Sequence, residues 1–252
     1  MTTWILLRGL TREAAHWGGF VDQLAAAVPG AEPVTIDMPG TGSRRGVASP
    51  WRLGAVTDAC REHWRSRGRK GRVALVGLSL GAMAVADWAQ RFPDEVDRAV
   101  LINTSMRRFG APWQRLRPGS WWPLLRVLMG GDARGAERVV LQWTSAYPAR
   151  HRSVLETWTA VRRTRPVRRI DACRQLVAAA RYEAPATSPH VPTLVAVGAW
   201  DRLVDPICSR RLATSWGSSL VVHPTAGHDL PLDAGPWLAE RIARWCAESV
   251  HS

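Results

Sequence analysis

Short runs of apolar and β-branched residues recur along the chain, and longer segments with apolar positions at helical spacing separate them. Strands that alternate with helix-length segments are joined by right-handed crossovers and form a mostly parallel sheet. The pattern therefore predicts an α/β fold in which helices flank the sheet. The predicted strands cover residues 4–7, 33–37, 72–77, 99–103, 194–198 and 220–224.

Local signals place several helices between these strands. Ser49 followed by Pro50 predicts an N-cap and a first helical position, opening a helix over residues 51–67 that ends at Gly68. Two further segments have apolar residues three and four positions apart, as an amphipathic helix requires. They are residues 80–92, which Pro93 stops, and about residues 235–248.

The alternation of strands and helices disappears between residues 104 and 192. Aromatic and arginine-rich helical patterns replace it, and the segment is too long for a loop inside a compact domain. We therefore expect a helical insertion at residues 104–192 that covers one end of the sheet. The α/β core then consists of residues 1–103 and 193–252.

Length and composition favour one soluble, cytoplasmic domain. A chain of 252 residues can form one substantial core. No basic segment precedes the first apolar run, and no run approaches the roughly 18 apolar residues that cross a bilayer. The cysteines lack C-x-x-C spacing, so we expect buried free thiols, and neither a metal nor a cofactor. They are Cys60, Cys173, Cys208 and Cys246.

The net charge of +13 is concentrated in the helical insertion. Residues 106–190 hold 16 arginines against 5 acids, whereas the rest of the chain holds 18 basic residues against 16 acids. Clustered charge favours an acidic substrate or an acidic partner such as an acidic carrier protein, and a solvated helix face is the alternative. The surplus arginines include Arg107, Arg108, Arg115, Arg117, Arg162, Arg163, Arg165, Arg168 and Arg169.

A sequence pI near 11.3 also raises the possibility of a nucleic-acid-binding module. The chain contains no helix-turn-helix, zinc-finger or RNP-type aromatic motif. The excess arginines, moreover, belong to the predicted insertion. We therefore expect no specific nucleic-acid partner.

Candidate chemistry centres on Ser79, in the G-x-S-x-G run that extends from Gly77 to Gly81. The run follows a predicted strand and opens a predicted helix, a turn that exposes the serine hydroxyl at the carboxyl edge of a sheet. Glycine at both ends lets the turn close and the helix approach the strand. An ordinary strand-to-helix turn with a serine N-cap is the alternative.

A serine hydroxyl needs a base to take its proton, and that base is usually a histidine. His228 follows the predicted strand at residues 220–224 and so lies at the same edge of the sheet; a solvent-exposed loop histidine is the alternative. The other histidines lie in helical patterns, in or beside the insertion, in a strand or in the terminal tail. They are His16, His63, His151, His190, His223 and His251.

The acid that orients this histidine should lie between the serine and the histidine in the chain. Asp201 comes just after the predicted strand at residues 194–198. Asp205 is the rival, although its place before Pro206 suits the N-cap of the next helix. Asn103, after the previous strand, carries no charge to stabilise an imidazolium. We therefore predict that Ser79, His228 and Asp201 form the catalytic set.

Acyl transfer also needs hydrogen-bond donors for the oxyanion. The backbone N–H of Leu80 is the first candidate, and that of Leu10, after Arg8-Gly9, is the second. The insertion also contains large apolar residues that either line an acyl pocket or hold the insertion to the core. They are Trp113, Trp121, Trp122, Leu125, Leu128 and Trp143. The predicted substrate contacts are Arg8, Trp121, Trp122 and Trp200.

Together these elements resemble the α/β-hydrolase superfamily over about residues 4–248. The resemblance implies a helical cap that roofs the substrate pocket. Most relatives have His-Gly where this chain has Arg8-Gly9, and the first two strands of the eight-stranded family sheet are absent, so we expect about six strands. The matching elements are the Gly9 loop, Asp37-Met38-Pro39-Gly40-Thr41-Gly42-Ser43 (similar to D-x-P-G-x-G-x-S), the turn at Ser79, the GxxDxxV-like segment around Asp201, and Gly227-His228.

The resemblance implies a carboxylesterase-type serine hydrolase without a cofactor. Serine at the position of the nucleophile disfavours dehalogenase and epoxide hydrolase chemistry, which use aspartate there in this superfamily. Thioesterase, lactonase, C–C bond hydrolase, perhydrolase and acyltransferase activities remain open, because a fold does not select among them. A non-catalytic binding protein with the same fold is the alternative of another class.

Overall fold

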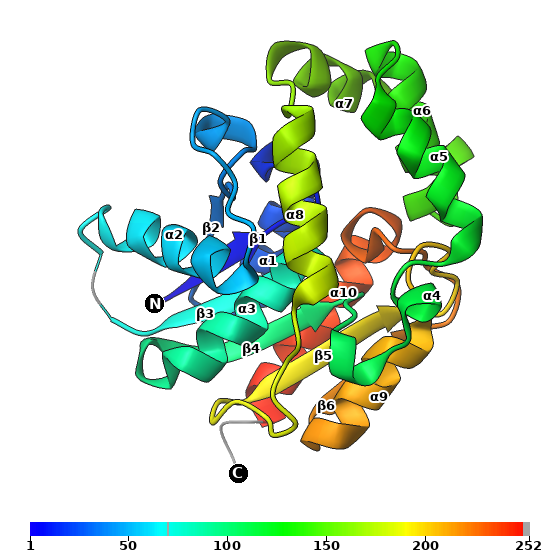
Figure 1. Cartoon of the computed structure of the whole chain (residues 1–252). Helices are drawn as coiled ribbons and strands as arrows, with labels where there is room; N and C mark the ends of the chain where they lie inside the picture. Colours follow the sequence, from blue (N-terminus) through cyan, green and yellow to red (C-terminus); the bar gives the residue numbers. More distant parts are fainter. Residues whose placement is uncertain (70, 249–252) are drawn as a thin grey trace.

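The computed structural model describes residues 1–69 and 71–248. Its centre is one sheet of six strands in the order β2-β1-β3-β4-β5-β6, in which every neighbouring pair is parallel (Figure 1). The predicted α/β fold with about six strands is confirmed. The strands are β1 (Thr2–Leu7), β2 (Ala31–Ile36), β3 (Val73–Leu78), β4 (Val96–Ile102), β5 (Thr193–Gly198) and β6 (Ser219–His223).

Helices cover both faces of the sheet because successive strand residues point to opposite sides. In β1, Ile5 and Leu7 belong to the core shared with α2, α3 and α9, whereas Trp4 and Leu6 belong to the core shared with α1 and α10. Figure 1 shows α2 and α3 in front of the sheet and α10 behind it. The bounds are α1 (Phe20–Ala27), α2 (Leu53–Arg65), α3 (Leu80–Arg91), α9 (Pro206–Trp216) and α10 (Leu230–Glu248).

The beginning of α2 differs from the prediction. The helix starts at Leu53 with Arg52 as its N-cap, rather than at Pro50 with Ser49. The backbone N–H of Ser49 instead donates to the Asp171 carboxylate, 2.8 Å away and far along the chain. A long-range hydrogen bond therefore holds this segment outside the helix. By contrast, α3 ends before Pro93 as predicted.

The segment between β4 and β5 is helical, as the sequence pattern indicates. Figure 1 shows α8 standing over the sheet beside α2 and α3, and α7, α6 and α5 forming an arch beyond it. No helix in the described ranges is both long and apolar enough to cross a membrane. The helices of the insertion are α4 (Pro112–Arg115), α5 (Pro118–Met129), α6 (Ala133–Thr144), α7 (Arg152–Thr164) and α8 (Arg169–Arg181).

The four cysteines are free thiols, although only some of them are buried. Burial raises the pKa of Cys60 to about 12 and that of Cys208 to about 11. Cys173, in contrast, is exposed, because α8 turns the neighbouring Asp171 and Ala172 inward. Buried thiols are therefore found at Cys60 and Cys208, whereas the expectation is wrong for Cys173, and Cys246 is only half-buried.

Candidate active site

Ser79 lies between the end of β3 and the start of α3, with φ 57° and ψ −114°. A positive φ is rare for a residue with a side chain, and such strained positions cluster at functional sites. The turn depends on its glycines. A Cβ on Gly81 would lie 2.1 Å from the Leu7 carbonyl oxygen, and one on Gly77 would lie 2.4 Å from that of Gly81. The close approach of strand and helix therefore requires glycine at both positions.

His228 and Asp201 are hydrogen-bonded to each other. The distance from His228 Nδ1 to Asp201 Oδ2 is 2.7 Å, and both residues are buried. The other carboxylate oxygen of Asp201 accepts the backbone N–H groups of Leu203 at 2.8 Å and Val204 at 2.9 Å. These bonds orient the carboxylate, and the bond at Nδ1 leaves Nε2 as the nitrogen that can exchange a proton.

Asp201 and Asp205, the two candidate acids, have different partners in the structure. Asp205 is the N-cap of α9 and accepts the backbone N–H of Ile207 at 3.0 Å, as its place before Pro206 predicts. It also forms an ion pair with Arg117 at 3.2 Å. Asp205 therefore has a structural partner, whereas Asp201 is the acid that contacts His228.

Asn103 supports the histidine loop, a role that the sequence did not reveal. Its side-chain amide donates to the carbonyl oxygens of Gly227 at 3.0 Å and His228 at 2.7 Å. Its side-chain oxygen accepts the backbone N–H of Gly198 at 2.9 Å. The sequence held one signal for this role. Asn103 is a polar residue at the end of β4, the strand between β3, which precedes Ser79, and β5, which precedes Asp201.

Sheet register brings the candidate residues to one edge. Leu78 pairs with Ile102, and Ile102 pairs with Ala196, so β3, β4 and β5 end side by side. The Thr104 hydroxyl also donates to the Ser79 carbonyl oxygen at 3.0 Å. Among the described residues, no hydrogen bond joins Ser79 Oγ to His228 Nε2. Catalytic hydrogen bonds often shorten only in the complex with substrate.

The loop after β1 lies against the serine. A Cβ on Gly9, the residue before Leu10, would be 3.4 Å from the Ser79 Cβ. Thr11 has a φ of 58°, and its N–H donates to the Gln175 side chain at 2.8 Å. Gln175, fully buried on α8, also donates to the Pro39 carbonyl oxygen at 3.1 Å. The insertion thus helps to position the predicted oxyanion loop, while the donor roles of Leu10 and Leu80 stay predictions.

Arg8, which was expected to contact the substrate, is paired with a carboxylate of this chain. Its guanidinium donates to both carboxylate oxygens of Asp229, at 3.1 and 2.7 Å, and both side chains are buried. It also lies 4.9 Å from the ring of Trp17. Because Asp229 follows His228 directly, this ion pair ties the predicted oxyanion loop to the histidine loop.

We expect Arg8→Gln to lower the free energy of unfolding by about 3–5 kcal/mol, because it leaves the buried Asp229 carboxylate unpaired. Urea denaturation followed by circular dichroism measures this loss. Combining Arg8→Gln with Asp229→Asn removes both charges and should restore most of the stability. A double variant no more stable than Arg8→Gln alone would contradict this explanation.

Asp233 connects the histidine loop to the insertion. Its carboxylate accepts the Ser145 hydroxyl at 2.5 Å and the backbone N–H groups of Ala146 and Gly227, each at 2.8 Å. Beside it, the N–H of Asp229 donates to the carbonyl oxygen of Thr144, the last residue of α6, at 2.7 Å. The position of the predicted base therefore depends on the insertion as well as on the sheet.

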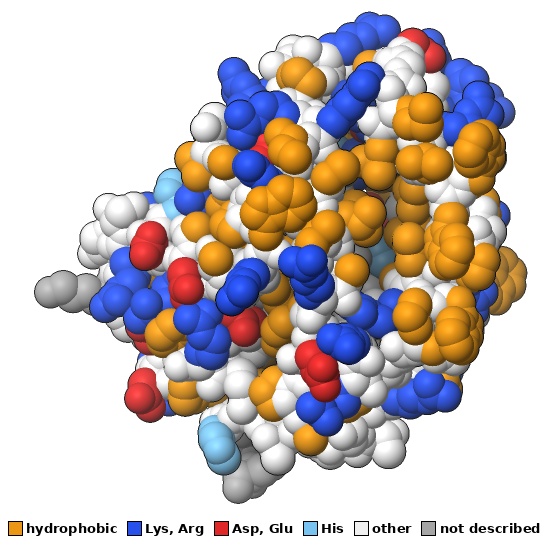
Figure 2. Space-filling view, viewed as in Figure 1, with side chains coloured by type: hydrophobic (Ala, Val, Ile, Leu, Met, Phe, Trp, Pro, Cys, Tyr) orange, Lys and Arg blue, Asp and Glu red, His pale blue; other side chains and the backbone are white. Residues whose placement is uncertain are grey.

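The tryptophans expected at the substrate lie largely in solvent. Trp121 is 50% exposed and Trp122 is 66% exposed, and the indole N–H of Trp121 donates to the Leu116 carbonyl oxygen. Both residues lie on α5, and their contact with a substrate stays a prediction. Trp200 is 54% exposed beside Asp201, and its substrate contact remains a prediction. Figure 2 shows apolar side chains around a hollow between α8 and α5.

Most of the surplus arginines of the insertion bind groups of this chain. Seven of the nine named above have an internal partner, whereas Arg163 and Arg169 have no ion pair within the described ranges. An acidic carrier protein as partner remains a prediction from the net charge. The pairs are Arg107 and Arg108 with Glu183, Arg115 with the carbonyl oxygens of Ala179 and Ala180, Arg117 with Asp205, Arg162 with Glu137, Arg165 with Glu13, and Arg168 with Asp171.

Comparison with known proteins assigns the chain to a family. The model of the alpha/beta hydrolase family matches residues 4–241. A hydrolase from Pseudomonas aeruginosa PA01 shares the fold at 21% identity and a TM-score of 0.80, over 97% of this chain and 89% of that one. An enol-lactonase from Burkholderia xenovorans LB400 does so at 20% identity and a TM-score of 0.80, over 98% and 92%. This chain belongs to the alpha/beta hydrolase family.

One curated relative matches a short segment. A homoserine O-acetyltransferase from Halorubrum lacusprofundi is 56% identical over 34 residues, which are 14% of this chain and 8% of that protein. Among the described residues, no group of three or more His, Cys, Asp or Glu side chains is arranged to hold a metal ion. The expected absence of a cofactor stays a prediction.

Proposed function

We propose that the chain is a serine hydrolase that cleaves carboxylic esters. The observation that carries the proposal is the hydrogen-bonded pair of His228 and Asp201 at the same sheet edge as Ser79, whose backbone is strained. A hydrogen-bonded acid and histidine provide the base that a serine hydroxyl needs. Strain at the serine supports catalysis over an ordinary N-cap.

In the proposed first step, His228 Nε2 takes the Ser79 proton while Oγ attacks the ester carbonyl carbon. Asp201 stabilises the imidazolium that forms, and the N–H groups of Leu80 and Leu10 stabilise the oxyanion. The imidazolium then gives its proton to the leaving alcohol, and an acyl-enzyme remains. In the second step the same histidine takes a proton from water, which attacks the acyl carbonyl carbon. The imidazolium then gives that proton to the leaving Ser79 Oγ, and the acid and the free serine result.

Thioesters, lactones, activated carbon–carbon bonds and acyl transfer to another acceptor are alternatives on the same residues. They differ in the leaving group or in the final acceptor rather than in the nucleophile. The described contacts favour none of them over an ester. A non-catalytic binding protein, by contrast, would not need a strained serine beside a hydrogen-bonded histidine and acid.

A fluorophosphonate probe and a substrate panel test the proposal. We expect the probe to label Ser79, because it reacts with activated serines, and peptide mapping identifies the site. We also expect p-nitrophenyl esters to be hydrolysed faster than thioesters of equal acyl length. An unlabelled protein without turnover on any ester would contradict the proposal, and faster turnover of thioesters would change the substrate class.

A further inference from the structure

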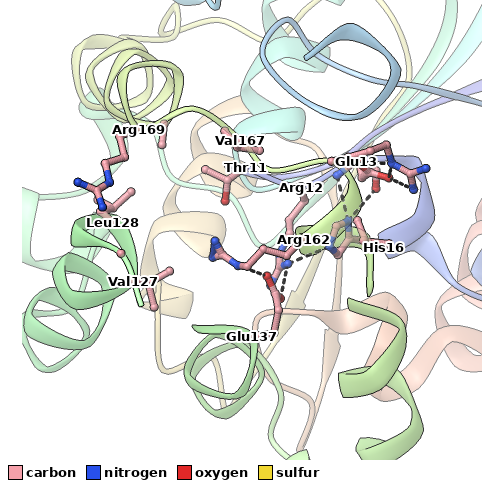
Figure 3. Close-up of a pocket in the computed structure, with 14 residues that line it drawn as sticks. Thr11, Arg12, Glu13, His16, Val127, Leu128, Glu137, Arg162, Val167 and Arg169 are labelled. Atoms are coloured by element: carbon pink, nitrogen blue, oxygen red, sulfur yellow. Dashed lines mark hydrogen bonds and ion pairs between the residues drawn. The ribbon is translucent and has the colours of Figure 1, made fainter. Parts of the chain in front are cut away.

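A cavity of about 160 Å³ lies between the loop after β1 and the helices of the insertion (Figure 3). Thr11 and Arg12 form its wall on the side of the core. On the other side, α5 contributes Val127 and Leu128, and α7 contributes Arg162. Ser79, His228 and Asp201 themselves do not line this cavity.

Positive charge exceeds negative charge around the cavity. Its lining holds four arginines, Arg12, Arg162, Arg165 and Arg169, but only two carboxylates, Glu13 and Glu137. Arg12 and Arg162 both bind Glu137 (Figure 3), at 2.6 and 2.8 Å. Arg165 forms an ion pair with Glu13. The internal ion pairs therefore leave a surplus of two positive charges.

Two of these arginines retain hydrogen-bonding capacity. Arg12 is only 8% exposed, yet its Nη2 has no hydrogen-bond partner among the described residues. Arg169 forms no ion pair in the described ranges, and its guanidinium lies against Gly130, where a Cβ would be 2.4 Å from Nη2. A guanidinium is always charged and suits a carboxylate or a phosphate.

His16, which also lines the cavity, does not add to the charge. Its Nε2 lies 2.9 Å from Arg12 Nη1, and burial together with the charges of Arg12 and Arg8 lowers the pKa of His16 well below its usual value. The neutral ring therefore accepts a hydrogen bond from Arg12. The excess charge of the cavity comes from arginine and persists throughout the neutral pH range.

Aliphatic side chains complete the walls. Val127 and Leu128 come from α5, Val161 from α7, and Val167 from the segment before α8. Apolar walls with a few charged groups are typical of small-molecule sites. The cavity thus combines surface for methylene groups with a cationic region for an anion.

The loop after β1 connects the candidate nucleophile with the cavity wall. Arg12 is three residues after Gly9, whose Cβ position is 3.4 Å from the Ser79 Cβ. Three steps along the backbone span at most about 11 Å. An acyl chain of roughly four to six carbons on Ser79 and the long side chain of Arg12 can together cover that separation.

We propose that this cavity binds a carboxylate at the far end of the acyl chain, so that the substrates are monoesters of short dicarboxylic acids. The inference rests on the proposed ester hydrolase function and names the substrate class. Arg12 and Arg169 supply the hydrogen bonds to the carboxylate, and the valines contact the methylene groups.

Two esters with the same leaving group test the inference. Mono-p-nitrophenyl glutarate has a free carboxylate, and p-nitrophenyl methyl glutarate has the same chain in neutral form. We expect kcat/KM to be about 10-fold to 100-fold higher for the anion, as hydrogen bonds to a charged group provide. Arg169→Gln, at the exposed arginine, should reduce this ratio about 10-fold. Arg163→Gln, an exposed arginine of α7 outside the cavity, is the matched control and should leave the ratio unchanged.

Direct binding separates failure of this inference from failure of the proposed function. Isothermal titration calorimetry with glutarate should show binding to the wild type that Arg169→Gln weakens about 10-fold. That result supports the cavity even if neither ester is hydrolysed. A kcat/KM ratio near one without glutarate binding would overturn the inference while leaving ester hydrolysis intact. Binding of inorganic phosphate but not glutarate would overturn it as well.

Discussion

Replacing Ser79 with alanine is expected to reduce kcat on the best ester of the panel about 10⁶-fold. Without Oγ no acyl-enzyme forms, and only the oxyanion donors and substrate binding still promote attack by water. KM should change little, because the hydroxyl contributes mainly to the chemical step. The measurement is a steady-state rate with purified protein, together with the loss of fluorophosphonate labelling.

Ser105→Ala is the control for this variant. Ser105 is also a buried serine near the end of β4, and its hydroxyl contacts the Arg115 carbonyl oxygen at 3.4 Å. Removing that hydroxyl should leave kcat within about twofold, since surrounding contacts change little. If Ser79→Ala kept more than about 1% of the wild-type rate, another nucleophile would be at work.

Asp201→Asn is expected to lower kcat about 10⁴-fold. The amide keeps an oxygen for the backbone N–H groups of Leu203 and Val204, so the loop should keep its shape. It cannot stabilise an imidazolium, however, and an amide N–H facing Nδ1 favours the wrong tautomer of His228. Steady-state kinetics across pH 6–9 measures the loss.

Asp205→Asn is the matched control four residues away. Asparagine is as good an N-cap as aspartate, and the lost ion pair with Arg117 is partly exposed and so contributes little. We expect stability within about 1 kcal/mol of the wild type and unchanged kcat. Equal losses in the two variants would show that the loop as a whole, rather than the charge of Asp201, supports catalysis.

The strands and the turn at Ser79 could be predicted because their determinants are local. Alternating side chains within a strand pack on both faces of the sheet, and two glycines allow the serine to adopt a positive φ. The start of α2 could not be predicted in this way. Its N-cap signal at Ser49 was overridden by a hydrogen bond to Asp171, a partner 122 residues away.

The supporting residues of the site depend on still longer separations. Arg8 and Asp229 are 221 residues apart, and Thr11 and Gln175 are 164 apart. The sequence showed Arg8 as a cation near the site, but not the carboxylate that binds it. Asn103 was set aside because it lacks charge, yet its amide and carbonyl groups are what the histidine loop needs.

The sequence by itself therefore determined the parallel α/β sheet, the strained turn that presents Ser79, and the chain order in which Asp201 and His228 follow. Those features come from neighbouring residues and from the rule that parallel strands end at one edge. Only the tertiary structure decided which charges meet. A buried guanidinium must find a carboxylate, and folding brings Asp229 to Arg8 and Glu137 to Arg12 from distant parts of the chain. The same contacts leave the cavity beside Thr11 with its surplus of positive charge.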